Sequence, residues 1–393
     1  MSDSSWRCSS ISTPAIRPIY AILTQVDGTD MRHIIPNLLA IAMLGLAHAT
    51  HAAVVIDTGL VYATGTVHAH TSPVQTNLVL DVYRPADPAD RTGSALVLVH
   101  GGGFVSGSRT SADMQDAGTY FAERGWVCFS IDYRLVPDDP PAPAWLEAFS
   151  NAVWTAAHAA MVDTKRAVRW VRANAATYGC DTNRVAGLGH SAGAYCVLQA
   201  VISDAADCAN DTGTPTPDQL PGYAGGLNAG VEVSGGVDLN AAEFDAGDPP
   251  LMIWHGDSDS TVPYTEAQEI HGECLDHGIP YRFFTLPGAD HGAATWTALY
   301  DGRGLKEHAF EFLNLFFALH AEIDYAAGDL LLSWPSLSNA VYVVHATTNL
   351  AVPFTNAPGS VLTSRADTCT AVWPTPGPRG FFLIEIRSGQ DVE

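Results

Sequence analysis

The chain has 393 residues, 47% of them hydrophobic, which is enough for one large buried core and a smaller second domain. Its formal net charge of −23 and pI of about 4.8 argue against nucleic acid or an anionic membrane as the principal partner. None of the seven cysteines forms a Cys-x-x-Cys pair or a Cys/His cluster with zinc-ligand spacing, so no metal is expected.

The N-terminal segment predicts a processing signal. Residues 31–33 form a short basic start, residues 38–47 form an apolar run, and two small-x-Ala cleavage sites follow. This order is typical of a secretory signal peptide, and the apolar run is too short to span a bilayer. We therefore predict a signal peptide over 31–52 and a secreted protein, extracellular or periplasmic. Residues 1–30 are interpreted as an upstream extension from a misassigned start, with an amphipathic arm as the alternative.

Residues 53–321 alternate between strand-like and helix-like segments. Strands are expected at 77–83, 95–99, 126–131, 184–188, 230–237, 251–254 and 281–286, and helices at 151–178, 192–201 and 294–319. Such alternation predicts a mostly parallel sheet with helices on both faces. Ligands in these sheets bind at the carboxyl ends of the strands, so the segments that follow the strands are where a site is expected.

The first such segment, residues 100–103, reads His-Gly-Gly-Gly directly after an apolar strand. Consecutive glycines allow backbone N–H groups to approach a substrate without Cβ clashes. An acyl-transfer enzyme needs such donors where the oxyanion develops, and one donor is worth about 3 kcal/mol of transition-state stabilisation. Gly102 and Gly103 are therefore predicted as oxyanion-hole donors, together with the N–H of Ala192.

Residues 189–193 read Gly-His-Ser-Ala-Gly between an apolar strand and a helix. This Gly-x-Ser-x-Gly pattern is typical of a nucleophile elbow, a sharp turn that exposes the serine hydroxyl and needs small flanking residues. Glycine-rich turns that contain serine are common, so the pentapeptide gains its weight from the triglycine segment upstream. Ser191 is the predicted nucleophile.

A serine nucleophile needs a base and an acid that orients the base. Residues 255–263 read His-Gly-Asp-Ser-Asp-Ser-Thr-Val-Pro after a strand, and two aspartates compete for the acid position. Asp259 is preferred because it lies deeper in the loop, whereas Asp257 is expected to hold the loop by backbone hydrogen bonds. His291 follows the next strand and is the predicted base, which gives the chain order Ser, Asp, His.

The residues from 322 to 393 differ in composition from those before them. Strand-like stretches at 330–334, 340–345 and 381–386 are separated by Pro, Asn and Gly turns, which favours a small antiparallel β-sandwich. This part resembles the fibronectin-III-like modules of exported bacterial hydrolases. A spacer or attachment module is the preferred interpretation. Contact with a surface or polysaccharide is the alternative, since Trp334 and Trp373 are as compatible with a core as with a binding platform.

With these motifs, residues 53–321 resemble the α/β-hydrolase superfamily, in particular exported carboxylesterases that carry His-Gly-Gly-Gly. The similarity is to cap-poor feruloyl and acetylxylan esterases and some polyester hydrolases, and more distantly to hormone-sensitive-lipase-like esterases. The resemblance implies Ser191 as nucleophile, His291 as general base and then acid, Asp259 as its partner, and no cofactor. The substrate is not fixed by these motifs.

The loops that follow the strands are too short for a large cap, so an open site is expected. Phe104, Trp145 and Trp296 are predicted to line it as an aromatic wall, with ordinary packing as the alternative for each. An open site, export and an accessory β-domain favour bulky or polymer-linked esters, such as decorated polysaccharides or aromatic polyesters. A peptidase of the same fold and a non-catalytic binding protein with an adhesive C-terminal module remain as alternatives.

Overall fold

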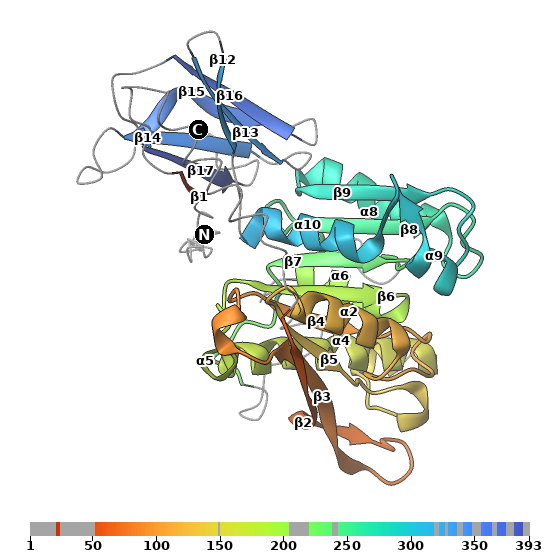
Figure 1. Ribbon diagram of the computed structural model, residues 1–393. Coiled ribbons are helices and arrows are strands. Elements are labelled where there is room, and N and C mark those ends of the chain that lie inside the picture. Colours follow the sequence, from red (N-terminus) through yellow and green to blue (C-terminus); the bar gives the residue numbers. More distant parts are fainter. Residues whose placement is uncertain are drawn as a thin grey trace, which may run out of the picture.

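The computed structural model describes the hydrolase-like part of the chain almost completely (Figure 1). The described ranges are 21–23, 52–147, 150–203, 220–237, 243–317, 322–326, 329–335, 341–347, 355–363, 368–374 and 381–387. The predicted signal peptide lies outside these ranges except for its last residue. Within the described ranges, no helix combines the length and the apolar character needed to cross a bilayer.

An eight-stranded sheet forms the centre of the molecule, in the order β2-β3-β5-β4-β6-β7-β8-β9. The strands are β2 (Val54–Val67), β3 (Val74–Pro85), β4 (Ala95–Val99), β5 (Val127–Ile131), β6 (Val185–His190), β7 (Ala229–Val233), β8 (Leu251–Gly256) and β9 (Tyr281–Leu286). β2, β3 and β5 pair antiparallel, and every other neighbouring pair is parallel. The predicted mostly parallel sheet is confirmed, and burial of its central strands on both faces explains their largely apolar sequences.

Helices cover both faces of this sheet, because successive residues of a strand point to opposite sides. Leu96 and Leu98 of β4 join a core with α2 (Ala112–Ala122) and α10 (Leu305–Phe317). Val97 and Val99 face the second core. That core is covered by α4 (Ala152–Ala173), α6 (Ala192–Ile202) and α8 (Tyr264–His277). The short elements are α3 (Ala144–Glu147), α5 (Ala175–Tyr178), α9 (Ala293–Thr297) and the 3-10 turns η1 (Pro88–Asp90) and η2 (Val136–Asp138).

The single helix predicted over 294–319 is wrong. The segment forms α9, then the two-residue strands β10 (Leu299–Tyr300) and β11 (Arg303–Gly304), and only then α10. Asp301 and Gly302 connect the strands with φ values of 50° and 78°. Positive φ at both central residues is the geometry of a tight hairpin turn, and it stops a right-handed helix. The strand predicted over 230–237 likewise ends at Val233, because Ser234 has a φ of 51°.

The C-terminal strands form two antiparallel sheets. One contains β12 (Glu322–Ala326), β13 (Asp329–Pro335) and β16 (Thr368–Pro374), and the other β14 (Val341–Thr347), β15 (Thr355–Thr363) and β17 (Phe381–Arg387). β1 (Ala21–Leu23), from the predicted upstream extension, pairs with the edge of β17. The strands are antiparallel as expected, and the domain boundaries and the role of this part stay predictions.

Candidate active site

The predicted catalytic groups lie in the segments that follow β4, β6, β8 and β9. These strands are parallel and lie close together in the sheet, so their carboxyl ends meet along one edge (Figure 1). Each segment contributes a different chemical group to that edge: backbone amides, a hydroxyl, a carboxylate and an imidazole.

The turn between β6 and α6 holds Ser191 in a strained backbone conformation, with φ 53° and ψ −121°. A Cβ at Gly189 would lie 2.1 Å from the carbonyl oxygen of Gly193. A Cβ at Gly193 would lie 2.0 Å from the carbonyl oxygen of Val99 in the neighbouring strand. Both glycines are therefore required by close backbone contact. The N–H of Ser191 donates to the carbonyl of Val233 at 2.8 Å, which fixes the turn to β7.

The side chains of Ser191, His291 and Asp259 form one continuous chain of hydrogen bonds. Nε2 of His291 lies 2.8 Å from Oγ of Ser191, and its Nδ1 lies 2.8 Å from Oδ2 of Asp259. A carboxylate only accepts hydrogen bonds, so Nδ1 holds the proton and Nε2 is the acceptor for the hydroxyl. The Asp259 side chain is fully buried, whereas that of His291 is 16% exposed. The chain thus runs from a reachable hydroxyl to a buried negative charge.

Two backbone amides hold the carboxylate of Asp259 in place. The N–H groups of Thr261 and Val262 donate to its Oδ1 at 2.9 and 2.8 Å. Burial alone would raise the pKa of Asp259, but hydrogen bonds from His291 and from these amides lower it below its usual range. Asp257 has a different position, because its Oδ1 accepts from the N–H of Gly288 at 2.7 Å and makes no contact with His291 within the described chain.

Asp290 is a site residue that the sequence analysis missed. Its Oδ1 accepts hydrogen bonds from the N–H and hydroxyl of Ser260, at 2.8 and 2.9 Å, and from the N–H of His291 at 2.7 Å. Its carbonyl accepts from the hydroxyl of Thr295 at 2.7 Å. Asp290 therefore ties the acid loop to the base loop. An aspartate directly before the predicted base was the available signal, since Asp side chains often hold turns.

The triglycine segment lies against the nucleophile. A Cβ at Gly101 would lie 3.2 Å from Cβ of Ser191. Within the described residues, the N–H groups of Gly102, Gly103 and Ala192 donate no hydrogen bond. Three backbone donors without partners beside a nucleophilic hydroxyl are what an oxyanion hole requires. Gly102, with a φ of 122°, also cannot take a side chain, because its Cβ would meet the carbonyl of Ser106 at 2.1 Å.

The three predicted substrate-binding aromatics have different surroundings. Phe104 is 7% exposed and packs edge-on against Tyr133 and Tyr195, which favours the packing alternative. Trp145 belongs to α3, and its side chain lies outside the part that the structure describes. Trp296 is half-buried, with its ring 5.6 Å from the ring of His190, next to the nucleophile.

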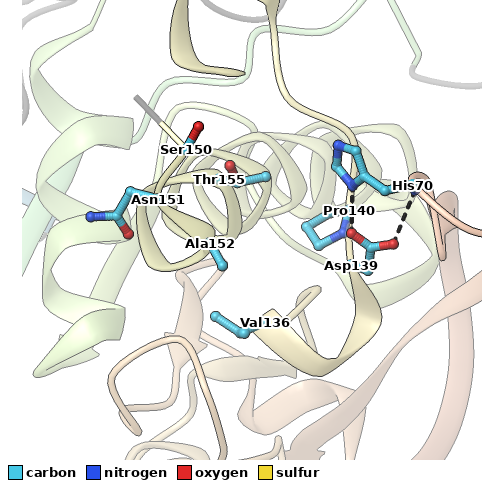
Figure 2. Close-up of a pocket in the computed structure, with 8 residues that line it drawn as sticks. All are labelled: His70, Val136, Asp139, Pro140, Ser150, Asn151, Ala152 and Thr155. Atoms are coloured by element: carbon cyan, nitrogen blue, oxygen red, sulfur yellow. Dashed lines mark hydrogen bonds and ion pairs between the residues drawn. The ribbon is translucent and has the colours of Figure 1, made fainter. Parts of the chain in front are cut away.

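A cavity of about 400 Å³ lies where the β2–β3 connection meets the start of α4 (Figure 2). Its lining residues are His70, Val136, Asp139, Pro140, Ser150, Asn151, Ala152 and Thr155. The N–H of His70 donates to Asp139 at 3.0 Å and its Nδ1 lies 2.5 Å from the same carboxylate, so hydrogen bonds from His70 lower the pKa of Asp139. The N–H of Val136 donates to the carbonyl of Phe104 at 2.8 Å, which joins the cavity wall to the triglycine segment.

Comparison with known proteins agrees with this geometry. The BD-FAE family matches residues 80–245, and the prolyl oligopeptidase family matches residues 238–314. Esterase LipQ of Mycobacterium tuberculosis is 27% identical over 317 residues, which cover 70% of this chain and 68% of LipQ. Esterase LipC of the same organism is 27% identical over 54% of this chain and 56% of LipC. The propionate-bound esterase 2 of Thermogutta terrifontis is 25% identical, with a TM-score of 0.50 over 68% of this chain and 96% of that esterase.

The strand order, the elbow and the structural relative define the class: the chain has the α/β-hydrolase fold. Within that class it is a carboxylesterase, a hydrolase of carboxylic esters. Within the described ranges, no group of three or more His, Cys, Asp or Glu side chains is arranged to hold a metal ion.

Proposed function

We propose that this protein hydrolyses carboxylic esters through an acyl-enzyme intermediate formed on Ser191. His291 takes the hydroxyl proton as Oγ bonds to the ester carbonyl carbon, and then gives it to the departing alcohol. A water molecule then attacks the acyl-enzyme while His291 accepts a proton from it. The carboxylic acid is released, and His291 returns the proton to Ser191. The observation that supports this most is the pair of 2.8 Å contacts that connects Ser191 to His291 and His291 to Asp259.

Charge stabilisation is proposed at both ends of this proton transfer. Asp259, held negative by two backbone amides, faces the imidazolium that forms on His291. The unpartnered N–H groups of Gly102, Gly103 and Ala192 are proposed to bind the oxyanion of the tetrahedral intermediate.

The direct experiment is hydrolysis of p-nitrophenyl acetate and butyrate by Ser191→Ala. We expect kcat to fall by about 10⁴-fold or more while the melting temperature is unchanged, because the hydroxyl supports no part of the fold. The adjacent Ser234→Ala, in the segment after β7, serves as a control for loss of a buried hydroxyl. Turnover retained by Ser191→Ala would exclude the mechanism.

Bulky esters are the substrate class we propose. The cavity beside α4 combines apolar Val136 and Ala152 with polar His70 and Thr155, and its wall is bonded to the segment that follows the triglycine. Such a cavity suits the larger part of a feruloyl, acetylated-sugar or aromatic polyester substrate. We also propose that the chain is secreted and that its C-terminal strands attach it to a surface, because polymeric esters lie outside the cell.

Filling the cavity tests this substrate class. Ala152→Phe places a ring in it, and Val153→Phe adds the same ring one position along, where the side chain is 40% exposed and does not line the cavity. We expect Ala152→Phe to lower kcat/KM for methyl ferulate and for a terephthalate ester about tenfold, and to leave p-nitrophenyl acetate unchanged. An equal effect of both variants, or of Ala152→Phe on all esters, would refute the role of the cavity.

Amide hydrolysis is the second candidate, favoured by the match of residues 238–314 to the prolyl oligopeptidase family. Comparison of an acyl-Ala-Pro p-nitroanilide with p-nitrophenyl butyrate separates the two activities. We expect kcat/KM to favour the ester by at least about 10³-fold, and a preference for the anilide would identify a peptidase instead. A non-catalytic binding protein would turn over neither.

Export is tested on the mature protein. Edman or mass-spectrometric sequencing of the exported chain is expected to find an N-terminus between about residues 50 and 53, where the small-x-Ala sites end. An exported chain that begins at Met1 would contradict the signal peptide.

A further inference from the structure

The residue before the nucleophile, His190, stacks against the proposed base, His291. It ends β6, and its ring centroid lies 5.8 Å from that of His291 with only 28° between the two planes. The ring centroid of the Trp296 indole lies 5.6 Å from that of the His190 ring. The His190 ring therefore neighbours both the base and the indole of Trp296.

The same imidazole is bonded to a second carboxylate. Nδ1 of His190 lies 2.9 Å from Oδ2 of Asp113, in the first turn of α2, and the Asp113 side chain is 20% exposed. The other oxygen of Asp113 accepts from the N–H of Met114 at 2.9 Å. Burial would raise the pKa of Asp113, but the bond from His190 lowers it, so the carboxylate is negative at neutral pH.

From this geometry we infer that His190 and Asp113 are positioning residues: a second imidazole–carboxylate pair that supports positive charge on His291. The inference rests on the proposed function, because it assumes that His291 takes the proton of Ser191. The Asp113 carboxylate can only accept a hydrogen bond, so Nδ1 of His190 holds a proton. Within the described chain, Nε2 of His190 is buried and has no hydrogen-bond partner. The Asp113 carboxylate thus places a negative charge, next to His190, near the imidazolium that forms during acylation.

Other charged groups near the His190–Asp113 pair also act on the charge of His291. α2 also provides Asp116, which is bound by Lys306 of α10 and by the indole N–H of Trp296 at 3.4 Å. From the loop side, His291 itself is bonded to Asp259. Asp116 is already neutralised by a cation and its side chain is 47% exposed, so its field at His291 is screened more than that of Asp113.

The pH dependence of kcat/KM distinguishes charge support from simple packing, since its acid limb reports the base in the free enzyme. Asp113→Asn keeps the shape and the acceptor for Met114 but removes the charge. We expect the acid limb to move to lower pH by about half a unit, because an imidazole that loses a nearby anion binds its proton about threefold less tightly. The plateau kcat is expected to fall about three- to tenfold with KM unchanged.

Asp116→Asn is the matched control, since it removes the same charge from the same helix without touching His190. Its acid limb is expected to coincide with that of the unmodified enzyme. Asp113→Glu keeps the charge, so its acid limb is expected at the pH of the unmodified enzyme. If Asp113→Asn does not fold, Asp113→Ser replaces it and is expected to show the same shift to lower pH.

An unshifted limb in folded Asp113→Asn, or an equal shift in Asp116→Asn, would overturn the inference. All these variants keep Ser191, His291 and Asp259, so such a result would leave the proposed function standing. Failure of the proposed function itself appears separately, as turnover by Ser191→Ala.

Discussion

The two halves of the active site are held by different forces. The nucleophile half, from the triglycine segment to the start of α6, is fixed by backbone packed so closely that a Cβ at Gly193 would lie 2.0 Å from a carbonyl oxygen. The acid–base half, the loops after β8 and β9, has one such contact, since a Cβ at Gly256 would lie 2.2 Å from the carbonyl oxygen of Ala289. Its other glycines are open: apart from their chain neighbours, no atom of the described residues lies within 4 Å of a Cβ placed at Gly288 or Gly292. There the shape comes from aspartate side chains that accept backbone N–H groups.

This difference explains why only the nucleophile half of the site has a recognisable sequence motif. Steric closure leaves glycine as the only residue at several positions, so the nucleophile half has a recognisable sequence pattern. Polar anchoring needs only an acceptor at the right place in three dimensions, so the acid–base half shows isolated aspartates and histidines. Substitutions that act on one force and spare the other test this difference.

The largest effect is expected from an alanine in the closed half. Gly193→Ala must displace β4 from α6, so we expect a destabilisation of about 4 kcal/mol or more and no measurable turnover. Gly288→Ala, in the open half, meets only the strain of its φ of 71° and is expected to cost about 1 kcal/mol. Chemical denaturation of both measures this. Similar losses from the two variants would remove the contrast.

Within the acid–base half, the two aspartates of the first loop are expected to differ strongly. Asp259→Asn leaves His291 without its anion and favours the wrong tautomer, so kcat should fall by about 10³- to 10⁴-fold. Asp257→Asn keeps an amide oxygen that can accept from the N–H of Gly288 and should lower kcat less than about tenfold. The reverse ranking in steady-state kinetics would reassign the acid.

Glu232 lies on β7 between the halves, level with Gly189 of β6 and Ile253 of β8. It is fully buried, and burial raises its pKa to about 8. The folded state therefore keeps a proton that the unfolded state releases above pH 4.5, so stability falls as pH rises from 4.5 to 8 and then levels. The slope is at most about 1.4 kcal/mol per pH unit.

Glu232→Gln should remove that slope. We expect the variant and the unmodified protein to have similar free energies of unfolding near pH 4.5, and the variant to be the more stable above pH 8. Urea denaturation at several pH values measures both curves. Parallel curves would show that Glu232 is ionised in the folded protein.

A smaller effect than that of Asp259→Asn is expected from Asp290→Asn. Hydrogen bonds from the N–H groups of Ser260 and His291 lower the pKa of Asp290, so the ionised form stabilises the loops above the unfolded pKa. That stability is lost as pH falls through the lower, folded pKa. The amide oxygen still accepts one N–H, and displacement of His291 is expected to lower kcat about tenfold. Full activity would show that the remaining loop contacts are sufficient.

The sequence predicted the sheet better than the connections between its strands. The run at 95–99 matches β4 because a fully buried strand favours apolar residues, and the run at 281–286 matches β9, which is only partly buried. The hairpin after α9 was missed because Leu299 and Tyr300 continue an apolar pattern, and only the positive φ of Asp301 and Gly302 interrupts it.

The site was predictable where one residue type is obligatory. The glycines around Ser191 have no substitute, whereas Asp290, Asp113 and His190 act through contacts with residues far away in the chain. His190 lies 77 positions from Asp113, and no local pattern predicts that bond. Phe104 was predicted at the cleft because it follows the triglycine. Its backbone has a positive φ of 62°, and its side chain packs in the core.

The most direct test of the account is covalent labelling of the nucleophile. Incubation with a p-nitrophenyl dialkyl phosphate, which transfers its phosphoryl group to an activated serine and releases p-nitrophenol, should inactivate the enzyme with one label per chain. Peptide mass spectrometry is expected to find the label on Ser191, and His291→Ala should react far more slowly. Labelling of another residue, or unchanged reactivity without His291, would contradict the account.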